Sequence, residues 1–132
     1  MDIESSAEVR ILVDRFYEKV RRDPLIGPIF DEVAKVDWPS HLATLYSFWE
    51  TLLKVGEGNG VHSGAPFPKH ARLPVEKAHF DRWLQLFLET VDENFSGEKA
   101  NEAKGRALSI ADTFARRMGL LPPRTVLLSS DP

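Results

Sequence analysis

Residues 64–84, GAPFPKHARLPVEKAHFDRWL, decide how the rest of this chain is interpreted. They place His70 in a short segment, rich in proline, that comes just before a strongly apolar helix. That helix carries Trp83 on the face that His70 would meet. A histidine in such a place belongs either to a cofactor site or to an ordinary core with one polar residue beside it. The other segments of the chain distinguish between these two interpretations.

The length and composition fit one globular domain. The chain has 132 residues, of which 42% are hydrophobic and 28% are charged, and a chain of this size buries enough surface for one core. Seventeen basic and twenty acidic residues give a net charge of −3 without a long basic run, so we expect no nucleic-acid partner. Cysteine is absent, which excludes disulfides, a thiol nucleophile and thiolate-bound metals. The polar N-terminus and the lack of a long apolar run predict a cytoplasmic protein without membrane contact.

The apolar periodicity predicts four helices and no strands. The first helix begins at Ser6, as its cap, and stops before Pro24, because proline forces the preceding residue out of the helical region. The second helix takes Asp37 as its cap, and Gly119 is placed to end the last one. The other expected helices cover about residues 38–53, 74–94 and 98–118. The remaining segments are expected to be an apolar turn at 24–30 that packs back on the core, an irregular segment at 56–73 and a loose tail at 119–132. Residues 1–132 are thus expected to form one domain with its core at about 6–118.

The candidate polar side chains have ordinary structural interpretations when the pattern alone is considered. Tyr17 and Trp83 lie on apolar helix faces, where such residues usually belong to the core. His41 borders the apolar face of its helix, and His70 stands among exposed residues. No His-Glu-x-x-His run or Gly-x-Ser-x-Gly motif is present, so the sequence supports neither a zinc site nor a serine hydrolase.

Five pieces of the chain, in this order and spacing, resemble a truncated haemoglobin. They are Phe16-Tyr17, Pro28-Ile29-Phe30, His41 with Phe48-Trp49, His70-x-x-Leu73-Pro74-Val75, and His79-Phe80-x-x-Trp83-Leu84. The resemblance covers about residues 8–118, and the combination of Tyr17, His41 and Trp83 is similar to the third group of that family. It implies an all-α, globin-like fold, the truncated two-over-two helical sandwich, with one haem b. The glycine-rich run at 56–60 and the tail after Met118 depart from the family pattern.

The resemblance also implies a role for individual residues. His70 would be the proximal ligand of the haem iron, and His79 remains the rival for that role. Tyr17, His41 and Trp83 would form the distal side and interact with the bound ligand. The residues expected to line the haem are Phe30, His41, Leu45, Phe48, Trp49, His70, Arg72, Phe80, Trp83 and Phe87. Lys69, Arg72 and Arg82 are candidate partners of the haem propionates, although all three fit equally well as solvated surface cations.

The function implied by the resemblance is reversible binding of O2, NO or another diatomic ligand. A second interpretation is an enzyme acting on bound O2, NO or peroxide, as a nitric oxide dioxygenase or a peroxidase does. That activity would need an external reductase, because the chain shows no reductase domain. A third interpretation is a helical interaction module without haem, which predicts a colourless protein.

Overall fold

Four α-helices and one short π-helix make up the described part of the chain. The computed structural model describes residues 1–33, 37–57, 60, 76–117 and 119. In chain order the elements are α1 (Ser6–Arg22), η1 (Ile29–Val33), α2 (Trp38–Leu53), α3 (Lys77–Asn94) and α4 (Glu98–Arg117). No strand occurs within these ranges, so the predicted all-α fold class is confirmed. No helix among them combines the length and the apolar character that crossing a membrane requires.

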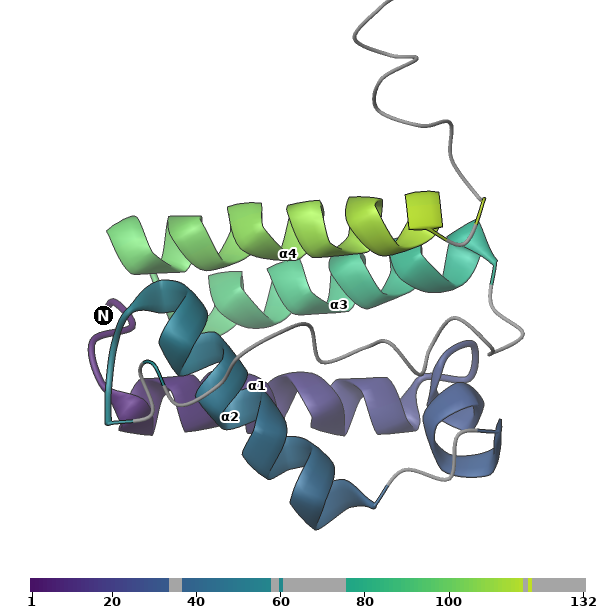
Figure 1. The fold of residues 1–132 in the computed structure, drawn as a ribbon, viewed down its shortest axis with the longest axis horizontal. Coiled ribbons are helices and arrows are strands. Elements are labelled where there is room, and N and C mark those ends of the chain that lie inside the picture. The colour runs from purple at the N-terminus through teal and green to yellow at the C-terminus, as the bar shows by residue number, and fades with distance from the viewer. Residues whose placement is uncertain (34–36, 58–59, 61–75, 118, 120–132) are drawn as a thin grey trace, which may run out of the picture.

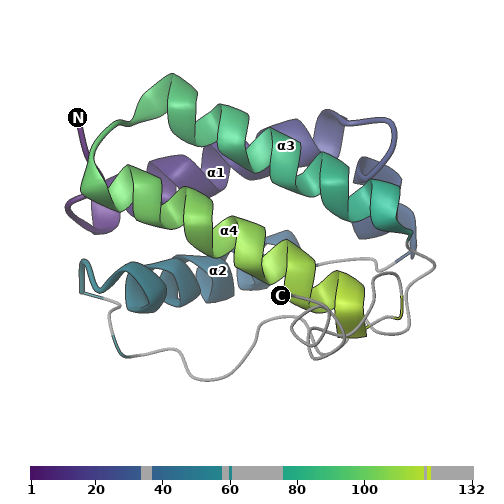
Figure 2. The same ribbon diagram turned by 90° about the horizontal axis from the view of Figure 1, so that it is seen from above.

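The helices form two layers with the core between them. In Figure 1, α3 and α4 lie side by side in the upper layer, while α2 crosses α1 below them. Between the layers, α1 packs on α3 and α2 packs on α4. Figure 2 shows the α3 and α4 pair from above, lying over the other two helices. The arrangement is the expected two-over-two sandwich, and both of its layers contribute to the candidate site.

Helix α1 follows its predicted apolar face closely. Its cap is the extended Ser5 rather than Ser6, and the Ser6 hydroxyl instead accepts the backbone N–H of Glu57 at 2.9 Å. The helix ends at Arg22, and the extended Asp23 precedes Pro24 as expected. Its buried residues are Val9, Leu12, Val13, Phe16, Tyr17 and Val20.

The turn after α1 packs back on the core, as the sequence predicts. Ile26 and Phe30 are buried, and Gly27 lies against the end of α1. A Cβ atom at Gly27 would stand 2.8 Å from the carbonyl oxygen of Arg21, so the chain can turn this tightly only because a glycine is there. The π-helical turn that follows was not expected from the sequence. It places Phe30 beside α1 and α2.

Helix α2 has the predicted bounds. Asp37 is the cap and Pro39 lies in the first turn, although the Asp37 carboxylate accepts the Ser40 hydroxyl at 3.0 Å rather than a backbone N–H. The helix ends where Lys54 adopts a left-handed conformation with φ 58°. Helix α3 begins at Lys77, later than the predicted start at 74, and Glu76 is its cap.

The first residues of the chain are part of the fold, which the sequence analysis did not foresee. Ile3 is fully buried. The Asp2 carboxylate accepts the backbone N–H groups of Lys99 at 3.0 Å and of Ala100 at 2.8 Å. It therefore acts as the cap of α4, with its negative charge at the positive end of that helix.

Small side chains allow α4 to approach the core closely. Its buried residues are Ala100, Ala103, Ala107, Ala111 and Ala115. Ile110 and Phe114, which the periodicity places on the same apolar face, are only half-buried. Gly119 has a positive φ of 76° and its N–H donates to the carbonyl of Arg116 at 3.0 Å, which fits the predicted helix end.

Candidate functional site

Aromatic side chains from η1, α2 and α3 lie around Tyr17, which is on α1. We call Tyr17, Phe30, Trp38, His41 and Trp83 the Tyr17 cluster. The ring centroid of Tyr17 lies 5.9 Å from Phe30, 5.7 Å from Trp38 and 5.7 Å from His41. These distances are typical of aromatic packing. The fold thus brings together residues that are far apart in the sequence, among them all three predicted distal residues.

Trp83 hydrogen-bonds the Tyr17 hydroxyl. An indole N–H can only donate, so the hydroxyl oxygen accepts this bond and its own O–H remains free to donate elsewhere. Burial raises the pKa of Tyr17 far above its usual value, and the hydrogen bond from Trp83 offsets only part of this effect. Tyr17 is therefore a protonated donor at any physiological pH. The sequence analysis expected Trp83 and Tyr17 both to interact with a ligand, which stays a prediction; the structure adds a hydrogen bond between the two residues.

His41 carries a buried nitrogen that is unsatisfied. Its Nε2 atom is shielded from solvent and has no hydrogen-bond partner among the described residues. Burial lowers the pKa of His41, so the neutral imidazole is favoured. Buried polar atoms are nearly always paired, so this nitrogen is a candidate contact for a polar ligand.

A second feature lies between α2 and α4, where apolar residues remain partly open. A cavity of about 220 Å³ separates these helices, and Phe48, Leu52, Ile110 and Phe114 contribute its apolar lining. The polar part of the lining includes Arg106 and Arg117, both exposed, together with Ser109 and Thr113. An apolar cavity lined in part by cations suits a ligand that is largely hydrophobic and bears negative groups.

Other predicted lining residues lie in the core. Phe87 is fully buried and stacks with Trp83 at 5.8 Å and with Trp49 at 4.8 Å. Leu45 is also buried, whereas Phe80 and Phe48 are half-buried. Phe87 therefore stacks on both Trp49 and Trp83, and the contact of these residues with a cofactor stays a prediction.

The predicted iron ligand lies outside the described residues, as do Arg72 and Lys69. Its rival can be assessed. His79 Nδ1 accepts the backbone N–H of Glu76 at 2.7 Å, so a neutral His79 ring carries its proton on Nε2. Both nitrogens are then occupied, and neither offers a lone pair to a metal. The structure therefore argues against His79 as an iron ligand.

Two residues of the site, Trp38 and Phe16, were not predicted as site residues from the sequence. A third residue, Arg82, had been a candidate partner of a haem propionate. Trp38 and Phe16 contact the Tyr17 ring directly. The spacing of three residues between Trp38 and His41 on one helix is the signal that could have identified the former. Arg82, expected as a propionate partner, instead pairs with Asp23 at 2.7 Å.

Comparison with known proteins agrees with this geometry. The family model for bacterial-like globins matches residues 2–117, so the chain belongs to the bacterial-like globins and is a haem-binding globin. Within that class it is a truncated haemoglobin similar to the third group. A group 3 truncated hemoglobin of Campylobacter jejuni is 37% identical over 107 residues, which are 78% of this chain and 82% of that protein. The crystal structure of a group III truncated hemoglobin from the same species matches with a TM-score of 0.73 and 34% identity, over 89% of this chain and 95% of the other.

The residues present fit a haem. The unpaired Nε2 of His41 and the free hydroxyl of Tyr17 are suited to a small polar ligand. The half-buried rings of Phe48 and Phe114 are suited to a flat apolar group. A buried nitrogen such as His41 Nε2, which has no partner among the described residues, is unusual in a core that binds nothing.

Proposed function

We propose that the protein binds one haem b and holds O2, or a similar diatomic ligand, reversibly beside Tyr17 and His41. The observation that carries this proposal is the Tyr17 hydroxyl. It is buried and protonated, and its oxygen accepts the Trp83 hydrogen bond, so its O–H is available as a donor. The Nε2 atom of His41, whose ring packs against Tyr17, has no partner among the described residues. A diatomic ligand would give both groups a partner.

When bound, haem supplies the iron atom at which a diatomic ligand coordinates. His70 is the residue proposed to hold that iron, since His79 is occupied by its own helix cap. The Tyr17 O–H would donate a hydrogen bond to the bound ligand. Trp83 keeps the hydroxyl turned toward it, and Phe30 and Trp38 exclude water. A donor of this kind binds more strongly as its acceptor gains negative charge.

His41 has a separate proposed role. Its ring packs edge-on against Tyr17 and Trp38, at 5.7 Å and 5.6 Å, so it belongs to the same cluster as the Tyr17 hydroxyl. Burial lowers the pKa of His41, so the ring is neutral, and its Nε2 atom can either accept or donate a hydrogen bond, depending on the tautomer. It is placed to make a second contact to the ligand, or to leave the pocket when a ligand enters.

One absorption spectrum tests the haem proposal. We expect an intense Soret band in the purified protein or after addition of hemin, and a further shift on reduction and exposure to CO. His70→Ala should abolish or grossly alter this spectrum. His79→Ala is the matched control, because it removes a neighbouring histidine and should leave the spectrum as it is. A colourless protein, or a spectrum lost in the control and kept in His70→Ala, contradicts the assignment.

A second candidate function is chemistry on the bound ligand. The observation that favours it is the hydrogen bond from Trp83 to Tyr17, which would strengthen the Tyr17 donor, together with the unpaired Nε2 of His41 in the same cluster. Such an arrangement slows ligand release and can polarise an O–O bond, as nitric oxide dioxygenation or peroxidase turnover requires. An external reductase would then be the electron donor. Slow O2 release with rapid NO consumption supports the enzyme, whereas fast release supports ligand delivery.

A further inference from the structure

The end of α1 contains a buried carboxylate that the proposed ligand chemistry does not use. Asp23 ends this helix, and its side chain is 3% exposed. Burial by itself would raise the pKa of Asp23, but the hydrogen bonds from Arg82 and from the N–H groups of Ile26 and Leu25 outweigh it and hold the pKa below its usual value. A buried charge of this kind persists only when its partners are all in place.

One carboxylate oxygen of Asp23 organises the turn toward Phe30. Oδ2 accepts the backbone N–H groups of Leu25 and Ile26, both at 3.0 Å. The Asp23 carbonyl also accepts the N–H of Gly27 at 2.9 Å. These three bonds fix the tight turn that carries the chain into η1, and so they fix where Phe30 meets the Tyr17 ring.

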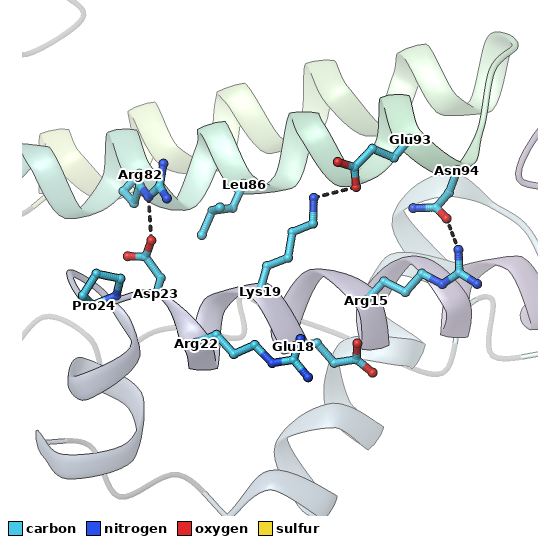
Figure 3. A pocket seen from close by; sticks show the side chains of 10 residues that line it. All are labelled: Arg15, Glu18, Lys19, Arg22, Asp23, Pro24, Arg82, Leu86, Glu93 and Asn94. Carbon is cyan, nitrogen blue, oxygen red and sulfur yellow. Dashed lines mark hydrogen bonds and ion pairs between the residues drawn. The ribbon is translucent and has the colours of Figure 1, made fainter.

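The other oxygen reaches across to α3. Oδ1 accepts the Nε–H of Arg82 at 2.7 Å, and Arg82 directly precedes Trp83 on that helix. Figure 3 shows the two side chains meeting at one end of the seam between α1 and α3. Tyr17 lies less than two helical turns before Asp23 on α1. The Asp23–Arg82 pair therefore connects α1, which carries Tyr17, to α3 at the position directly before Trp83, the residue that donates to the Tyr17 hydroxyl.

We propose that Asp23, acting through Arg82, is a positioning residue that holds the Trp83 indole N–H in line with the Tyr17 hydroxyl. The inference rests on the proposed function in so far as that hydroxyl contacts a ligand. Loss of the Asp23–Arg82 pair allows α3 to shift against α1 at Trp83. The indole then donates less well to Tyr17, and the hydroxyl turns away from the ligand more often.

The same seam offers a matched control at its far end. Lys19 pairs with Glu93 at 2.6 Å, and Glu93 is largely exposed; Arg15 hydrogen-bonds Asn94 beside it (Figure 3). These contacts also join α1 to α3, across a groove of about 490 Å³. They lie three turns along α3 from Trp83. A variant there weakens the seam without touching the donor.

The experiment uses the protein as purified, in its reduced form with CO added, and follows the Trp83 indole N–H by 1H–15N NMR. We expect Asp23→Asn and Arg82→Met each to shift this resonance and to speed its hydrogen exchange about fivefold. In the O2 form both variants should release O2 about threefold faster. Arg82→Lys, which keeps the charge, should lie between Arg82→Met and wild type in both measurements. Glu93→Gln should leave both at the wild-type values.

Three outcomes decide the inference. It is overturned if Arg82→Met lowers the melting temperature but leaves the exchange and the O2 release rate unchanged, because the pair is then merely structural. It is also overturned if Glu93→Gln produces the same changes. Arg82 is one-third exposed, so its variants keep the test decisive if Asp23→Asn does not fold. A protein that binds no haem defeats the proposed function, while the indole exchange in the same sample still decides the role of Asp23.

Discussion

The series connection of Trp83 and Tyr17 predicts how their substitutions combine. Tyr17→Phe removes the O–H that faces the ligand. A hydrogen bond to a ligand carrying partial negative charge contributes about 1–1.5 kcal/mol, so we expect O2 release to become about tenfold faster. Trp83→Phe keeps the Tyr17 hydroxyl but removes its fixed orientation and its polarisation by the indole. We expect a smaller acceleration, about threefold, since such cooperative strengthening is a fraction of one bond.

The double variant separates a series from two independent donors. If Trp83 acts only through Tyr17, its substitution has nothing left to disturb once the hydroxyl is gone. Tyr17→Phe/Trp83→Phe should then release O2 at the rate of Tyr17→Phe alone, about tenfold above wild type. If Trp83 instead donates to the ligand directly, the two factors multiply to about thirtyfold.

The assay is stopped-flow displacement of O2 by CO on the reduced protein, with wild type and the three variants of the cycle measured in parallel. Tyr46→Phe is the control, because it also removes a tyrosine hydroxyl, one that donates to Asp14 on the surface of α1 rather than in the pocket. It should not change the release rate. Multiplying factors would refute the series arrangement, and a Tyr17→Phe rate equal to wild type would refute the role of the hydroxyl itself.

Three further predictions concern stability and pH. Asp2→Asn should lower the free energy of unfolding by about 1 kcal/mol. Backbone hydrogen bonds outweigh the opposing effect of burial and lower the pKa of Asp2. The difference in stability from wild type, measured by urea titration, should therefore disappear as the pH falls through the acidic range. Burial lowers the pKa of His41, so its contribution to stability is lost as the pH drops below about 6.5; His41→Leu should flatten that part of the pH profile, and an unchanged slope would exclude the effect. Gly27→Ala should cost about 1–3 kcal/mol because its Cβ would meet the carbonyl of Arg21 at 2.8 Å, whereas Gly105→Ala, where nothing lies within 4 Å, should be neutral or stabilising in thermal melts.

The sequence by itself determined the helices and the residue types of the pocket. Apolar periodicity of 3.6 residues is a local signal, and it located α2 at its true bounds. Pro24 marked the end of α1 because proline acts on the residue before it. Five short motifs in the right order and spacing were sufficient for the family resemblance, which the comparisons confirm.

Only the tertiary structure decided how these residues act on one another. Nothing local predicts that Trp83 donates to Tyr17, that Asp23 holds Arg82, or that Asp2 caps α4, since each bond joins residues distant in the sequence. The direction of a hydrogen bond, the burial that shifts a pKa and the nitrogen left unpaired on His41 depend on which helices meet and at what separation. These quantities are set when the two layers pack. For that reason the segment 64–84 could name Trp83 as a candidate site residue, but only the packed fold showed that Trp83 hydrogen-bonds the Tyr17 hydroxyl.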